Sequence, residues 1–592
     1  GLFAAQTHCG NEKALDVAKS LGDFIDKFFA KINDEQLQKI LNCEHGGINE
    51  SLAELYARTN EKRFLDLSIR IRHQKTLGPM FEQKDALPGI HANTQIPKVI
   101  GLARLYELTK KEEYATAARY FWANVTNNYT YVIGGNSDRE YFQSPNSISK
   151  YITEQTCESC NTYNMLKLTR HLFEWNPNSA YFDYYERAHF NHMLAHQNPR
   201  SGAFAYMIPL MSGMAREWSS ETNDFWCCVG SGMETHSKHG ESIYWKADKH
   251  LLVNLFIPSM LNWQEQNAEI ELTTEYPKSD EISLSVNKIG KSADFKVSLR
   301  IPFWADNASL KINGKNAKFA KENGYATIQR KWKKGDTVAL KLPMKLRFEA
   351  TKDDPNIVAL LHGPLVLAAD LGESSNPYQN VSAAFVGANL LGSIVPTNKV
   401  LTFETKGIGR PNQMTLKPFY SQWERRTAVY FHKFTDAEWT KEQAILAAEE
   451  VRLKDLQARS VDVMKLGDEK EEKAHGLVSK ISYGLSYRAK PGRDARTEGF
   501  FEFKMKVVDA PLTLRATYWG EESKRQFYIL VDGNKIATET LGYGKKGEFV
   551  ERDYKISQEL MKGKSEVLVR FEPEKGNTAG HVFGCLIFRS EK

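Results

Sequence analysis

The first 248 residues contain a repeat of about fifty residues, and this repeat restricts the chain to a small set of helical architectures. The segment 55–64 (Leu-Tyr-Ala-Arg-Thr-Asn-Glu-Lys-Arg-Phe) resembles the segment 105–114 (Leu-Tyr-Glu-Leu-Thr-Lys-Lys-Glu-Glu-Tyr), an offset of 50, and residues 11–15 resemble 60–64, an offset of 49. Apolar residues within these segments recur at helical spacing. A unit of two helices and a polar turn is typical of stacked helical hairpins. We therefore predict a portion of an (α/α) barrel over residues 1–248.

The start of the chain adds an expectation about this barrel. The first residue is Gly1 rather than Met, and residues 1–5 have a sequence typical of the middle of a helix. About seven or eight helices are expected before residue 248, fewer than a barrel of six hairpins needs. We expect that the N-terminal part of the barrel lies outside this sequence.

From residue 249 onward the apolar pattern changes from helical spacing to alternation, which indicates strands. Asn-Gly pairs at 313–314 and 323–324 separate the alternating runs, as in β-hairpins. The predicted fold is therefore a multidomain α+β chain, with the barrel followed by β-sandwich and β jelly-roll domains. The predicted segments after the barrel are a β-sandwich over 249–370, a mixed, mostly irregular or β segment over 371–450, a charged linker over 451–480 and a C-terminal β-sandwich or jelly-roll over 481–592.

Length and composition exclude several classes of protein. A chain of 592 residues is too long for one hydrophobic core, so several domains are expected. The net charge of +6 is small for this length, and no basic run is interleaved with aromatic residues, which argues against a nucleic-acid partner. No apolar run reaches the ~20 residues of a membrane span. The motifs of phosphate loops, dinucleotide sites and esterase nucleophile elbows are absent.

Four of the seven cysteines lie in two short stretches, 154–160 and 225–230. Adjacent cysteines such as Cys227 and Cys228 do not readily form a disulfide with each other, so a shared metal ion is the better interpretation. Thiolates with a carboxylate suit zinc. The candidate ligands are Cys157, Glu158, Cys160, Cys227 and Cys228. Their spacing allows either a closed structural zinc site or a zinc site with a reactive thiolate.

Three further residues are candidates for a polar site. Glu140 lies in the glycine-bearing loop 134–142, where a carboxylate is most often simply solvated. His45 and His91 each precede the first helix of a predicted hairpin. Either histidine can serve as a helix cap or as a contact to a ligand in the barrel mouth.

Three motifs carry a resemblance to a known family. Residues 158–168 (Glu-Ser-Cys-Asn-Thr-Tyr-Asn-Met-Leu-Lys-Leu), 184–188 (Tyr-Tyr-Glu-Arg-Ala) and 225–234 (Phe-Trp-Cys-Cys-Val-Gly-Ser-Gly-Met-Glu) resemble the β-L-arabinofuranosidases of glycoside hydrolase families 127 and 146, and are closest to family 146. The resemblance covers residues 1 to about 370 and, more loosely, the domains behind them. It implies a retaining hydrolase with a zinc-bound cysteine as nucleophile.

The resemblance also implies a role for individual residues. Cys227 would be the nucleophile and Glu140 the general acid/base, while Cys157 has no role in the family pattern. The implied zinc ligands are Glu158, Cys160, Cys227 and Cys228. His45 and His91 match positions that contact sugar hydroxyls.

The predicted function is therefore the release of terminal β-L-arabinofuranose from a plant oligosaccharide or polysaccharide such as pectin. One alternative is a hydrolase of another furanoside or a pyranoside on the same frame. A second alternative is a non-catalytic carbohydrate-binding protein with a structural zinc site, which would have no need of Glu140. Because a large polysaccharide does not readily cross a membrane, we expect an extracytoplasmic enzyme.

Overall fold

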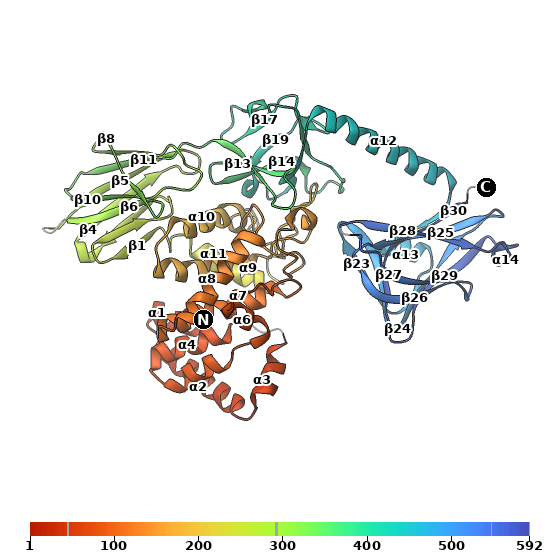
Figure 1. Ribbon diagram of the computed structural model, residues 1–592, viewed down its shortest axis with the longest axis horizontal. Coiled ribbons are helices and arrows are strands. Elements are labelled where there is room, and N and C mark those ends of the chain that lie inside the picture. The colour runs from red at the N-terminus through yellow and green to blue at the C-terminus, as the bar shows by residue number, and fades with distance from the viewer. Residues whose placement is uncertain (44–46, 291–293, 546, 591–592) are drawn as a thin grey trace. The chain divides into compact units, whose positions relative to one another are not determined.

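The computed structural model describes residues 1–43, 47–290, 294–545 and 547–590. The chain divides into two compact units, Gly1–Lys433 and Phe434–Lys592. Helices occupy the first part of the first unit, and β-sheets make up the rest of it (Figure 1). Every helix in the described part of the chain is too short or too polar to cross a membrane.

The predicted helical domain is confirmed, and the fifty-residue repeat marks its hairpins. The α-helices of this domain are α1 (Leu2–Cys9), α2 (Glu12–Phe29), α3 (Asp34–Leu41), α4 (Ile48–Thr59), α5 (Lys62–Arg70), α6 (Gln74–Phe81), α7 (Ala92–Thr109), α8 (Glu112–Asn128), α9 (Ser159–Trp175), α10 (Ser179–Ala188) and α11 (Cys227–Ser237). A π-helical turn, His189–Met193, continues α10. Three short connections, α1–α2, α4–α5 and α7–α8, each pass through one residue in the left-handed conformation: Gly10, Asn60 and Lys110.

Local hydrogen bonds explain why the repeated residues form the same turn at the ends of α4 and α7. The hydroxyl of Thr59 donates to the carbonyl of Leu55 at 2.8 Å, and that of Thr109 donates to the carbonyl of Leu105 at 2.7 Å. Asn60 and Lys110 then end α4 and α7 with φ angles of 56° and 58°. The same side-chain bond and left-handed cap recur fifty residues apart, so the sequence repeat is a repeat of helix ends.

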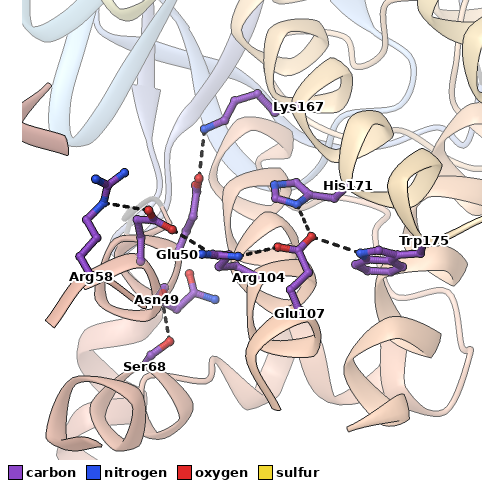
Figure 2. Close-up of polar contacts among 10 residues, drawn as sticks. Asn49, Glu50, Arg58, Ser68, Arg104, Glu107, Lys167, His171 and Trp175 are labelled. Carbon is purple, nitrogen blue, oxygen red and sulfur yellow. Dashed lines mark hydrogen bonds and ion pairs between the residues drawn. The ribbon is translucent and has the colours of Figure 1, made fainter. Parts of the chain in front are cut away.

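A polar network ties α4, α7 and α9 together (Figure 2). The carboxylate of Glu107 on α7 accepts hydrogen bonds from Arg104 at 2.9 Å, from His171 Nδ1 at 2.7 Å and from Trp175 Nε1 at 3.1 Å. Arg104 also pairs with Glu54 of α4 at 2.9 Å. The helix that begins at the cysteine-rich segment is therefore held against the repeat by bonds at its far end.

A β-sandwich follows the helices, as predicted. One sheet has the order β1-β2-β6-β10-β9 and the other β3-β4-β5-β11-β7-β8. The strands are β1 (Tyr244–Ala247), β2 (His250–Val253), β3 (Ser259–Trp263), β4 (Ala268–Thr274), β5 (Glu281–Lys288), β6 (Asp294–Arg300), β7 (Ser309–Ile312), β8 (Lys315–Ala317), β9 (Lys321–Glu322), β10 (Tyr325–Lys331) and β11 (Thr337–Lys341). The two Asn-Gly pairs form the β7–β8 and β9–β10 turns, with positive φ at both residues of each pair.

A buried ion pair joins α10 to the sandwich. Arg300, at the end of β6, has a side chain with no exposed surface. It pairs with Asp183 at 2.8 Å and with Glu186, and both carboxylates come from α10. The hydroxyl of Tyr276 donates to Glu186 at 2.8 Å. The sandwich therefore fixes the helix that leads into the π-helical turn.

A ten-stranded sheet completes the first unit, with the order β16-β17-β19-β14-β13-β21-β15-β18 and with β12 and β20 at its sides. Its strands are β12 (Leu346–Ala350), β13 (Ile357–His362), β14 (Leu365–Glu373), β15 (Ala384–Val386), β16 (Ile394–Pro396), β17 (Phe403–Thr405), β18 (Gly409–Arg410), β19 (Thr415–Pro418), β20 (Arg425–Ala428) and β21 (Tyr430–Phe434). One face packs against Tyr131, Ile133, Cys157 and Ile208 of the helical domain. This sheet therefore packs against the loops that connect the helices.

The second unit contains α12 (Asp436–Arg459), α13 (Glu469–Ala474), α14 (Gln558–Met561) and a nine-stranded sheet. Seven strands follow the order β27-β26-β29-β24-β30-β25-β28, while β22 pairs with β30 and β23 with β24 beside this path. The strands are β22 (Ser460–Met464), β23 (Val478–Tyr487), β24 (Lys490–Lys506), β25 (Leu512–Trp519), β26 (Ser523–Val531), β27 (Asn534–Gly542), β28 (Phe549–Ile556), β29 (Glu566–Pro573) and β30 (Ala579–Arg589). Aromatic residues such as Phe501, Phe527 and Phe571 form its core.

The segment 451–480, predicted as a charged linker, is structured instead. It contains the end of α12, the strand β22 paired with β30, and α13. Its charges are explained by ion pairs one helical turn apart on α12, such as Lys454 with Glu450 at 2.6 Å, and by Glu472, which is buried against Arg493 at 2.6 Å. The predicted boundaries at 370, 450 and 480 also differ from the division found at residue 433.

Candidate metal centre and active site

The two cysteine-rich stretches meet at the N-termini of two helices. Glu158 is the N-cap of α9, and Cys160 lies in the first turn of that helix. Cys227 and Cys228 are the first two residues of α11. The first N–H groups of a helix and its dipole favour negative charge, so both helix ends lower the cost of forming thiolates.

The ligand atoms of these four residues lie within 4.8 Å of one another, so the group could hold a metal ion. The Cys160 and Cys228 sulfurs are 3.4 Å apart, and the Cys227 sulfur is 3.9 Å from that of Cys228. Glu158 Oε1 is 3.8 Å from the Cys227 sulfur. Cys157 is not part of this group: it packs with Tyr131 and Ile133 in the core behind the site.

The four side chains differ in exposure and in acidity. Cys227 is exposed, whereas Cys160, Cys228 and Glu158 are buried. Hydrogen bonds from the Cys160 and Cys228 thiols hold the pKa of Cys227 well below its usual value. Hydrogen bonding to Cys227 and to Cys228, with burial, raises the pKa of Cys160, and burial raises that of Cys228. Burial, followed by the charge of Cys227, raises the pKa of Glu158 to about 9. Cys227 is therefore the accessible thiol of the group.

These properties fit a bound cation. Three sulfurs and one carboxylate oxygen form the donor set of a thiolate-binding metal ion with four ligands. Glu158 Oε2 is buried and has no hydrogen-bond partner among the residues that the structure describes. Buried acidic groups that raise one another's pKa require a positive charge in order to ionise together.

The loop that carries Glu140 is held in a fixed, unusual conformation. Ser137, Arg139 and Glu140 have positive φ angles of 72°, 50° and 71°. The Glu140 carbonyl accepts from Ala92 N at 2.7 Å, and Arg139 N donates to the carbonyl of Gln155 at 2.9 Å. These bonds to both flanking segments offset the cost of the left-handed backbone. The loop is therefore held in place by its neighbours.

Glu140 and the predicted sugar contact His91 lie beside the thiolate group. Their ligand atoms and that of Glu158 are within 4.8 Å of one another. His91 Nε2 is 3.7 Å from Glu140 Oε2. The structure thus brings together six of the seven predicted site residues, and the seventh, His45, lies outside the described residues.

Tyr206 is a further site residue that sequence reasoning missed. Its hydroxyl donates to Glu140 Oε1 and lies 3.9 Å from the Cys227 sulfur. Burial and the bond to Glu140 raise the pKa of Tyr206. Its ring packs against Trp226, with ring centroids 5.5 Å apart. An isolated backbone bridge between Glu158 and Met207 brings Tyr206 to the site. Because this contact joins residues far apart in the sequence, no local motif marks Tyr206.

One large cavity lies away from this site. A space of about 490 Å³ is bounded by α8, α10 and β12, with Trp122, Arg187 and Glu349 in its wall. None of the six predicted site residues that the structure describes lines it.

The first unit is thus a helical domain backed by β-sheets, and it carries three thiols and a carboxylate that could hold a metal ion, with Glu140 beside them. Comparison with known families gives the class. The sequence model of the β-L-arabinofuranosidase GH127 catalytic domain matches residues 1–241, and that of the GH127 middle domain matches residues 250–344. Together they cover more than half of the chain, which belongs to the GH127 β-L-arabinofuranosidase family of glycosidases. Residues 455–587 match a family of unknown function, DUF6805.

Individual relatives are distant. A non-reducing end β-L-arabinofuranosidase of Bifidobacterium longum subsp. longum is 24% identical over an aligned length of 420 residues, and the match covers 61% of this chain. The match spans 62% of the length of that curated relative.

Three solved structures have a similar fold. One described as a glycoside hydrolase has 19% identity and a TM-score of 0.59, and the match covers 72% of this chain and 80% of that one. A GH127 β-arabinofuranosidase has 22% identity and a TM-score of 0.56, with 66% and 70% covered. A GH127 β-L-arabinofuranosidase from Geobacillus stearothermophilus T6 has 20% identity and a TM-score of 0.53, with 66% and 72% covered.

Proposed function

We propose that this chain hydrolyses terminal β-L-arabinofuranosides with retention of configuration, with Cys227 as nucleophile and Glu140 as general acid/base. The observation that carries the proposal is the position of the Tyr206 hydroxyl, which bonds to Glu140 and lies 3.9 Å from the Cys227 sulfur. The Cys227 thiol and the Glu140 carboxylate therefore both lie beside one hydroxyl group. Cys227 is also the exposed member of the thiolate group, as a nucleophile has to be.

The metal ion in this proposal is zinc, held by Glu158, Cys160, Cys227 and Cys228. When bound, zinc would keep the thiols ionised at neutral pH and moderate the basicity of the reactive sulfur. The donor set of three sulfurs and one carboxylate supports zinc over magnesium or calcium, which prefer oxygen ligands.

The residues of the chain would act in two steps. In the first, the Cys227 sulfur attacks the anomeric carbon, and Glu140 gives its proton to the oxygen of the departing group as the C–O bond breaks. In the second, the Glu140 carboxylate takes a proton from water, and the water oxygen displaces the sulfur. Each step inverts the anomeric carbon, so the product keeps the configuration of the substrate. Tyr206 would hold the Glu140 carboxyl in position for both proton transfers.

Three finer statements belong to the same proposal. The Phe-Trp-Cys-Cys motif supports a relationship to family 146 in addition to family 127. We propose that the substrate is an arabinose-containing plant glycan such as pectin, because the proposed reaction removes a terminal sugar of such polymers. Since such a polymer does not readily enter a cell, we also propose an extracytoplasmic location.

The test combines one substrate with two variants. The wild-type protein should cleave an aryl β-L-arabinofuranoside, and NMR should show the β-anomer of arabinose first. Cys227→Ala should abolish this turnover. Glu140→Ala should retain the bound metal, which elemental analysis measures, and azide should restore part of its turnover by replacing water in the second step. Near-native turnover by Cys227→Ala, or a wild type inactive on every furanoside tested, would contradict the proposal.

A further inference from the structure

Tyr141 is an aromatic residue fixed directly beside the proposed acid/base. Its N–H donates to the Asp138 carbonyl at 3.0 Å, and its carbonyl accepts from Asp138 N at 3.1 Å. An isolated backbone bridge also pairs Tyr141 with His91. The backbone of Tyr141 is therefore set by main-chain contacts, and these contacts do not require an aromatic side chain.

The side chain of Tyr141 is half-exposed, although its backbone is fixed. The exposed fraction is 45%. The ring packs against His91: its centroid lies 5.4 Å from that of the histidine ring at an angle of 68°. Nε2 of the same histidine ring is 3.7 Å from Glu140 Oε2. The tyrosine ring and the carboxylate of the proposed proton donor therefore both lie beside the imidazole of His91.

The chemistry of a retaining glycosidase indicates which part of the substrate would lie near Tyr141. The nucleophile attacks the anomeric carbon from the face opposite the departing oxygen, and the acid/base stands at the departing oxygen. A residue anchored beside Glu140 therefore lies on the leaving-group side. Phe225, which is 85% exposed, instead precedes the proposed nucleophile Cys227 by two residues.

We infer that Tyr141 is the platform on which the leaving-group sugar stacks, so that the preferred substrates are β-L-arabinofuranosides linked to another sugar ring. The inference rests on the function proposed above. The C–H-rich face of a sugar packs on an aromatic ring, and a tyrosine with a fixed backbone has few torsions to lose on binding. A small alcohol as leaving group would not reach the ring.

The experiment compares two substrates that differ only in the leaving group: a β-L-arabinofuranosyl disaccharide with an arabinofuranose leaving group, and methyl β-L-arabinofuranoside. The quantity measured is the ratio of their kcat/KM values. Tyr141→Ala should lower this ratio roughly three- to tenfold, as expected for the loss of one stacking contact. Tyr141→Phe, which keeps the ring, should retain the wild-type ratio.

Phe225→Ala is the matched control, because it removes an exposed aromatic ring two residues before the other proposed catalytic residue, Cys227. It should change kcat/KM for both substrates by the same factor. If Tyr141→Ala loses metal or melts early, Tyr141→Leu takes its place in the same ratio measurement.

The outcomes separate this inference from the proposed function. If the wild type cleaves both substrates and Tyr141→Ala leaves the ratio unchanged, the inference is wrong and the proposed function stands. If Phe225→Ala lowers the ratio as much as Tyr141→Ala, the assignment of sides is wrong. If the wild type cleaves neither substrate, the proposed function fails, and the inference fails with it.

Discussion

Replacing Tyr206 with Phe tests whether the hydroxyl that lies beside the proposed acid/base and the proposed nucleophile serves the reaction. The substitution removes one oxygen atom and keeps the ring, so the packing on Trp226 at 5.5 Å between ring centroids is retained. It removes the hydrogen bond to Glu140 and the 3.9 Å approach to the Cys227 sulfur. The fold and the metal ligands should therefore remain intact while the position of Glu140 becomes less fixed.

The expected loss follows from the kind of bond that is removed. A hydrogen bond to a charged group contributes about 1.5–3 kcal/mol. If this contribution is made in full in the transition state, kcat/KM falls by roughly ten- to more than a hundredfold, since each 1.36 kcal/mol is a factor of ten. Because the bond positions a proton donor and does not bind the sugar, the loss should be mainly in kcat.

The assay measures kcat and KM on an aryl β-L-arabinofuranoside, together with metal content and Tm. Tyr244→Phe is the matched control: the Tyr244 hydroxyl lies 3.0 Å from Ser259 Oγ within the β-sandwich, so this variant should keep the wild-type kcat. A change in kcat below threefold for Tyr206→Phe, with metal retained, would refute the role given to Tyr206. A loss of metal would show that the tyrosine supports the thiolate group instead.

Three further outcomes are expected. Arg300→Met should lower the free energy of unfolding by about 3–5 kcal/mol in urea denaturation, because it leaves two buried carboxylates without their cation, whereas a loss below 1 kcal/mol would contradict this. Burial raises the pKa of Asp183 to about 6, so the native state binds more protons than the unfolded state between about pH 4 and about pH 6. The contribution of Asp183 to the free energy of unfolding should therefore fall as pH rises through this range. Asp183→Asn should remove that contribution to the slope. Removal of metal by a chelator should abolish turnover and lower Tm, and added zinc should restore both, whereas full activity without metal would contradict the proposed centre.

Much of the helical domain could be predicted because its signals are local. The Leu-Tyr-x-x-Thr repeat is also a repeat of side-chain bonds and left-handed caps, so the letters that recur are the ones that end the helices. The Asn-Gly pairs likewise specify their own turns through positive φ. In both cases the residues that form the structure are neighbours in the chain.

Features that depend on distant contacts could not be predicted. Tyr206 reaches the site because Met207 pairs with Glu158 across 49 positions of the chain. The segment 451–480 has the composition of a linker, but β22 pairs with β30 more than a hundred residues later. A high density of charged residues indicates that a segment is exposed to solvent. An exposed helix or an edge strand is as compatible with such a composition as a linker is.

The position of Cys227 and Cys228 at the start of α11 explains why two adjacent cysteines are useful in this site. Successive residues on a helix point about 100° apart, so two cysteines in the first turn of α11 cannot face the same way. Cys228 is turned into the core, with its sulfur 3.4 Å from that of Cys160, whereas Cys227 is exposed and lies near Tyr206. Two adjacent cysteines at this helix end therefore supply one enclosed sulfur, that of Cys228, and one accessible sulfur, that of Cys227. A closed four-ligand site would have no use for that exposure, so the burial of Cys228 and the exposure of Cys227 together favour a reactive centre over a purely structural one.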